Sequence, residues 1–140
     1  MSRTRSFVLG FIGLGLAISM TACAPATADA NAAYCTSSAA AQSEVAKLKT
    51  MVTSSTATLD QIAAQRDAVA KANVTVNKDA EKLADEVKKE VIAADNAFYQ
   101  AVRAIPSSAT VPEASAAYQA AIKDWDQAML SIRSKVGCKS

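Results

Sequence analysis

Residues 59–105, LDQIAAQRDAVAKANVTVNKDAEKLADEVKKEVIAADNAFYQAVRAI, contain neither glycine nor proline, and they decide the fold. Apolar residues recur every three or four positions along the whole stretch, and only Arg66 and Asn73 interrupt them. The positions in this register are Leu59, Ile62, Arg66, Val69, Asn73, Val76, Ala80, Leu83, Val87, Val91, Ala94, Phe98, Ala101 and Ile105. An unbroken register of this kind predicts one amphipathic helix, with Thr58 as its cap and a length of about 70 Å at ~1.5 Å per residue.

The weak point of this helix is Val74-Thr75-Val76, which Asn73 and Asn77 flank. β-Branched and Asn side chains have poor helix propensity, so a break near Val74 is the alternative to a continuous helix. The continuous helix predicts an all-α, three-helix antiparallel bundle with one long central helix. The break predicts an up-down four-helix bundle instead.

A shorter helix is expected on the N-terminal side, from about Thr36 to Val52, with Ser37 or Ser38 as its cap. Its apolar stripe has the same spacing of three or four, with Ser38 filling one gap. The members of the stripe are Tyr34, Ala41, Val45, Leu48 and Val52.

A last helix is expected after Pro106, which ends the preceding one. Pro112 suits its first turn, Thr110 or Val111 its cap, and Gly137 its left-handed end. Its stripe consists of Tyr118, Ile122, Trp125, Met129, Ile132 and Val136.

The first residues predict export. Arg3 and Arg5 precede a short apolar run, which is typical of a signal peptide over residues 1–22. Met20-Thr21-Ala22-Cys23 resembles the bacterial lipobox, which implies cleavage before Cys23 and a diacylglycerol, often with palmitate, on its sulfur. The alternative is ordinary cleavage after Ala28, which would discard Cys23 and release a secreted protein.

The chain therefore divides into a signal peptide (1–22), a flexible tether of small residues (23–34) and a helical bundle domain (35–140). Cys35 and Cys138 lie at the two boundaries of that domain. Exported proteins form disulfides, and antiparallel packing brings these two cysteines together in either bundle. We expect a Cys35–Cys138 disulfide to close the domain.

Catalytic arrangements are not evident in the sequence. The chain has no histidine, so Ser-His-Asp and Cys-His systems are excluded. Fifteen basic and 13 acidic residues nearly balance, and two of the basic residues lie in the signal peptide, so nothing predicts a nucleic-acid partner. No cofactor or metal site is expected, and we predict that the protein is not an enzyme.

Two groups of acidic residues are candidate sites, the first of them for a divalent cation. Asp79, Glu81, Asp85, Glu86 and Glu90 alternate with lysines, which favours a solvated helix face extending from Lys78 to Asp95. Asp124 and Asp126 flank Trp125, which the stripe turns toward the core while the two acids face solvent. An apolar groove lined by Phe98, Tyr118, Trp125 and Met129 is the remaining candidate, with simple core packing as its alternative.

The pattern resembles a family of small actinobacterial secreted proteins and lipoproteins of uncharacterised function. The residues that carry it are Cys35, the segment SEVAKLK (Ser43–Lys49), the long Ala/Asp/Lys/Val helix and the terminal Cys138. Members often have glycine where this chain has Ser55-Thr56-Ala57-Thr58. The resemblance implies a helical, disulfide-closed envelope protein and no reaction.

These features predict a non-enzymatic lipoprotein of the cell envelope, a structural spacer or protein-interaction module with coiled-coil-like packing. Its location would be the outer face of the cell membrane, through lipid on Cys23, or the medium. Its partners would be the membrane and an envelope protein. The alternative function is binding of a small hydrophobic molecule or lipid.

Overall fold

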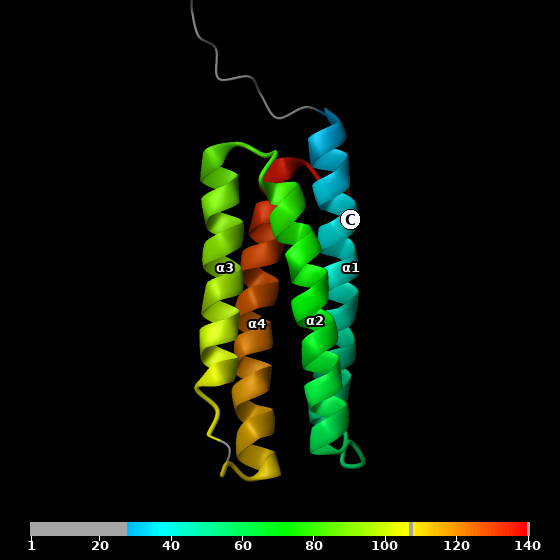
Figure 1. Cartoon of the computed structure of the whole chain (residues 1–140), viewed down its shortest axis with the longest axis vertical. Coiled ribbons are helices and arrows are strands. Elements are labelled where there is room, and N and C mark those ends of the chain that lie inside the picture. The colour runs from blue at the N-terminus through cyan, green and yellow to red at the C-terminus, as the bar shows by residue number, and fades with distance from the viewer. Residues whose placement is uncertain (1–27, 107, 140) are drawn as a thin grey trace, which may run out of the picture.

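The protein is an up-down bundle of helices. A computed structural model describes residues 28–106 and 108–139, and within them it contains helices and no strands. The helices are α1 (Ala28–Thr53), α2 (Leu59–Ala80), α3 (Asp85–Arg103) and α4 (Val111–Val136). In Figure 1, α1 begins at the same end of the bundle at which α4 finishes, and α2 connects to α3 there as well. The connections from α1 to α2 and from α3 to α4 lie at the opposite end.

The predicted single long helix is wrong, and the four-helix alternative is the one that this architecture fits. The break is not near Val74, since Val74, Thr75 and Val76 all lie within α2. It falls after Ala80, where the N–H of Lys82 donates to Asp79 O and that of Leu83 to Ala80 O, tightening the last turn.

Packing explains this difference. Leu83 turns its side chain into the core, with only 7% of its surface exposed. A single long helix would pair each half with one short helix, whereas folding back gives each half a second neighbour and buries more apolar surface. Because Ala80, Leu83 and Val87 keep the same spacing across the turn, periodicity alone could not reveal the reversal.

The expected start of the first helix is also wrong. Helix α1 begins at Ala28 rather than Thr36, so residues 28–34 are helical and do not belong to a tether. Ser37 and Ser38 are not caps: they are buried within α1, where their hydroxyls donate to the carbonyls of Tyr34 and Cys35. The expected signal peptide, Cys23 and the remaining tether residues lie outside the described residues.

The predicted ends of the other helices are confirmed. Thr58 caps α2 in a reciprocal pair with Gln61, at 3.3 and 2.9 Å. Thr110 precedes α4, and the Glu113 carboxylate accepts from its backbone N–H and hydroxyl, which lowers the pKa of Glu113. Gly137 ends α4 with φ +82°, and Cys138 N–H donates to Arg133 O at 2.9 Å.

The core runs the length of the bundle. It contains the whole predicted stripe of α1, and α4 contributes five of its expected members, namely Tyr118, Ile122, Trp125, Met129 and Ile132. On α3 the buried face is Val91, Asp95, Phe98 and Val102. Asp95 and Val102 are buried in place of the expected Ala94 and Ala101, each one position later in the sequence. An acid, Asp95, therefore lies in the interior.

Candidate functional site

The two predicted cysteines form a disulfide at the end of the bundle where α1 begins. The Sγ atoms of Cys35 and Cys138 are 1.96 Å apart, and the pair links α1 to the residue that follows the left-handed Gly137. Closing a loop across 103 residues restricts the unfolded chain far more than the folded one. This bond explains how the start of α1 is held against the end of α4.

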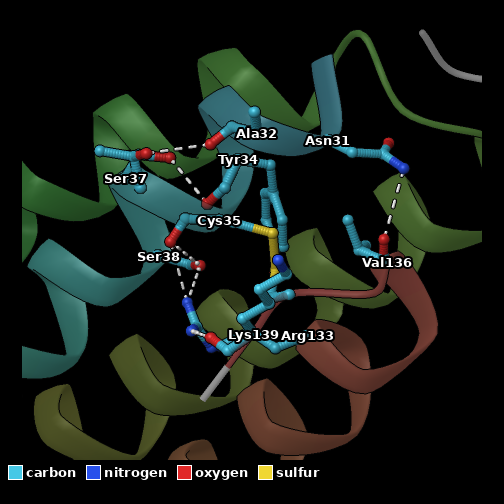
Figure 2. The surroundings of a disulfide bond; sticks show 11 residues. Asn31, Ala32, Tyr34, Cys35, Ser37, Ser38, Arg133, Val136 and Lys139 are labelled. Atoms are coloured by element: carbon cyan, nitrogen blue, oxygen red, sulfur yellow. Dashed lines mark hydrogen bonds between the residues drawn. A yellow bond between two sulfur atoms is a disulfide. The ribbon is translucent and has the colours of Figure 1, made fainter. Parts of the chain in front are cut away.

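Arg133 reinforces the same end, and Figure 2 shows its guanidinium directed at α1. Its Nη1 donates to the Cys35 carbonyl at 2.9 Å and to Ser38 Oγ at 2.7 Å, and its Nη2 reaches Lys139 O at 3.3 Å. The Asn31 amide adds a bond to Val136 O at 3.3 Å. These contacts join the start of α1 to the end of α4 on both sides of the disulfide.

A second polar group lies in the middle of the bundle around Asp95, whose surface is 2% exposed. The Trp125 indole N–H donates to Oδ1 at 2.9 Å, and the Asn77 amide donates to Oδ2 at 2.8 Å. Burial raises the pKa of Asp95, and these two hydrogen bonds oppose the rise. The carboxylate therefore joins α2, α3 and α4 through one side chain.

Other polar atoms near this carboxylate are buried with no hydrogen-bond partner among the described residues. They are Tyr34 Oη, both amide atoms of Asn73, and Asn77 Oδ1. Burial, then the charge of Asp95, raises the pKa of Tyr99; its hydroxyl lies near the Asn73 amide, without the geometry of a hydrogen bond. All four helices thus direct polar groups inward, but the surrounding core closes them off from solvent.

The sequence did not predict that Asp95 is buried, because it is the last residue of a charged segment that was expected to be a solvated helix face. A signal existed: Val91, Asp95, Phe98 and Val102 are also spaced three or four apart. The indole N–H of Trp125 was a second signal, since a buried Trp usually finds an acceptor.

The four residues of the expected groove are all buried, but they do not share one cavity. Phe98 and Trp125 lie with ring centroids 6.2 Å apart and line a small cavity of about 110 Å³ between α3 and α4. Met129 is fully buried in the core. Tyr118 lines a different and larger cavity, at the end of the bundle away from the disulfide.

This larger cavity, here called the distal cleft, has a volume of about 220 Å³. Its walls come from the end of α1, the start of α2, the residues after α3 and the start of α4. The lining residues are Met51, Val52, Ser54, Ala57, Leu59, Ile62, Ala63, Arg66, Ile105, Pro106, Ala109, Val111, Ala114, Ser115 and Tyr118. The Ser115 hydroxyl donates to Val52 O and so joins α4 to α1 at this wall.

Arg66 is the charged residue among those lining the distal cleft. Its Nε and Nη2 donate to Asp67 Oδ1 at 3.2 and 3.0 Å, and this bond raises the pKa of Arg66. The Tyr118 hydroxyl also lies near the guanidinium. A guanidinium has five N–H donors, so Arg66 keeps donors for a further acceptor.

The expected acidic face carries ion pairs with its lysines, including Lys82 with Asp79 at 3.7 Å and Lys88 with Glu81. Between residues 28 and 139, leaving out residue 107, no three His, Cys, Asp or Glu side chains are placed to hold a metal ion. None of the helices in this described part combines the length and the apolar character needed to cross a bilayer.

Compared with models of known protein families, with curated proteins and with solved structures, the chain matches none.

Proposed function

We propose that this protein is a non-enzymatic module of the cell envelope, held to the outer face of the membrane by lipid on Cys23, that presents the far end of its bundle to a binding partner. The observation that carries the proposal is the difference between the two ends of the bundle. The start of α1 and the end of α4 lie together at one end of the bundle (Figure 1), where the Cys35–Cys138 disulfide joins them. The residues that line the distal cleft belong to the opposite end.

The length of the bundle supports a role as a spacer. Helix α1 has 26 residues and is therefore about 39 Å long. Because α1 begins only a few residues after Cys23, a lipid there would place the disulfide end nearest the bilayer. The distal cleft would then stand about the length of α1 away from it.

The chemistry of the chain supports a non-enzymatic role. It contains no histidine, and Asp95, a carboxylate whose pKa burial raises, is bonded to Trp125 and Asn77 in the interior. The resemblance to small actinobacterial lipoproteins agrees with this proposal.

The test is the location and mass of the protein made from the full-length gene in an exporting bacterium. We expect the wild type in the membrane fraction, with an intact mass that includes a diacylglycerol on Cys23 and two hydrogens fewer for the Cys35–Cys138 bond. The Cys23→Ser variant should leave the membrane. A wild-type protein cleaved after Ala28 and found in the medium would contradict the lipid anchor.

A small-molecule binder is the second candidate, and the distal cleft is the observation that favours it. The proposed anchor and this binding role are compatible, since they use opposite ends of the bundle.

A further inference from the structure

We propose that the distal cleft binds a single-chain amphiphile with a carboxylate head group, its alkyl chain among the apolar walls and its carboxylate on Arg66 and Tyr118. This inference names the ligand class for the far end of the bundle, and it rests on the proposed function only for the position of that end away from the membrane.

Large apolar side chains are exposed at the rim of the cleft. Leu59 is 61% exposed and Val111 is 54% exposed, although both are large aliphatic residues that line the cleft. Apolar surface left in water costs about 25 cal/mol per Å², so a ligand that covers these side chains gains free energy. Met51, Ile62 and Ile105 continue the apolar wall inward.

The size of the cleft selects one chain. Its volume of about 220 Å³ lies below the roughly 300–1,000 Å³ of pockets that hold drug-sized ligands. A single alkyl chain suits such a volume, whereas the two chains of a phospholipid would need more room.

The charge among the residues that line the cleft is positive. Arg66 lines it, and no Asp or Glu belongs to its lining among the described residues. Asp67 contacts Nε and Nη2 of Arg66 and is itself mostly exposed, with 71% of its side-chain surface in solvent. The remaining N–H groups match the planar oxygens of a carboxylate, and the neighbouring Tyr118 hydroxyl supplies one more donor.

Two further hydroxyls line the cleft, and that of Ser54 already shares a hydrogen bond with Thr56 Oγ1 at 3.0 Å. Ser115 already donates to Val52 O, and this bond fixes the position of α4 against α1. The donors that remain therefore lie together at Arg66 and Tyr118, which defines one polar end for an otherwise apolar site.

The experiment is photoaffinity labelling of the full-length protein, in whichever fraction it is found, with dodecanoic acid that carries an alkyl diazirine. The matched probe is the corresponding dodecanol. We expect the acid to label peptides of the distal cleft, around residues 51–63 and 105–118, about tenfold more than the alcohol. Equal labelling by the two probes, or labelling spread along the bundle, would overturn the proposal.

Variants at the polar end separate charge from shape. Arg66→Gln should lower labelling by the acid about tenfold, to the level of the alcohol. Arg103→Gln is the control, because Arg103 is an exposed arginine of the neighbouring surface that does not line the distal cleft. If Arg66→Gln labels as well as the wild type, the carboxylate is not recognised there.

A filling variant tests the apolar part. Ala63→Phe places a ring in the cleft and should abolish labelling by both probes, with Trp125 fluorescence unchanged as evidence of an intact core. Undiminished labelling of this variant would refute the cleft as the site. The membrane anchor is tested separately, by the fraction in which the protein is found. A failed anchor therefore changes the location of the protein, whereas a failed ligand proposal changes only the labelling.

Discussion

Asp95 on α3 accepts a hydrogen bond from the indole N–H of Trp125 on α4, at 2.9 Å, in the interior of the bundle. The second oxygen of Asp95 accepts from Asn77 on α2 at 2.8 Å. A buried polar group is costly unless it is paired, so this carboxylate favours the arrangement of helices in which both donors reach it.

We predict that Asp95→Ala lowers the free energy of unfolding by about 1–3 kcal/mol, because Trp125 and Asn77 would each lose a buried acceptor. Asp95→Asn should be much milder. Its amide oxygen can still accept from Trp125, and its amide nitrogen can meet Asn77 Oδ1, which has no partner among the described residues. Urea unfolding followed by Trp125 fluorescence measures both variants. Equal losses for Ala and Asn would show that hydrogen bonding at this position is unimportant.

The same carboxylate predicts a pH dependence of stability. The pKa of Asp95 is raised above its ordinary value of 3.8, chiefly by burial, so the folded state holds the proton more tightly than the unfolded state. Its contribution to stability is then fully present below pH 3.8 and is lost as the pH rises through the folded pKa. The measurement is the difference in unfolding free energy between the wild type and Asp95→Asn across pH 3 to 8.

We expect this difference to move in favour of the variant as the pH rises from about 4, and to become constant once Asp95 is ionised. Glu113, whose pKa is lowered, acts in the opposite direction, but it is common to both proteins and cancels. A difference that does not change with pH would contradict the raised pKa of Asp95.

Loss of the disulfide should be more damaging than loss of any single hydrogen bond. We predict that the double variant Cys35→Ser, Cys138→Ser loses about 2–5 kcal/mol of unfolding free energy, since the unfolded chain regains the freedom that the closed loop removed. Cys23→Ser is the control, because it keeps both paired cysteines. Thermal unfolding of the full chain checks this prediction, and an unchanged Tm would mean that the bundle holds its two ends together without the bond.

Gly137→Ala tests the turn that leads into Cys138. Gly137 has φ +82°, and a Cβ there would meet no atom within 4 Å, so the cost is one of backbone conformation alone. We expect a loss of about 1–2 kcal/mol, the strain of placing an L-residue in the left-handed region. Ser134→Ala, an exposed position in the last turn of α4, should be nearly neutral. Equal stability of the two variants would contradict the left-handed turn.

Much of the fold could be predicted from local pattern. The stripe of Tyr34, Val45 and Leu48 in α1, and that of Ile122, Trp125 and Met129 in α4, are buried as their spacing indicates. Thr58, Thr110 and Gly137 mark helix ends because their side-chain or backbone preferences act within a few residues. The Cys35–Cys138 pair followed from antiparallel packing, which brings both ends of the domain together.

The candidate site was harder to predict. Tyr118 was expected to line a groove with Phe98, Trp125 and Met129, but it lines the distal cleft with residues from α1, α2 and the segment after α3. Arg66 was visible only as an interruption in an apolar stripe. The proposed role of Arg66 as the polar end of the distal cleft depends on Tyr118, which is remote in sequence and approaches Arg66 only after folding.

The sequence by itself determined the helical class, most of the residues that face the core, three helix ends and the pairing of the cysteines, because each depends on spacing or on contacts between near neighbours. Only the tertiary structure decided where the chain reverses after Ala80, that α1 extends back to Ala28, and that Asp95 is buried. The physical reason is that these outcomes depend on burial against other helices. A register of three and four residues records which side of a helix is apolar, but it contains no information about which neighbour covers that side.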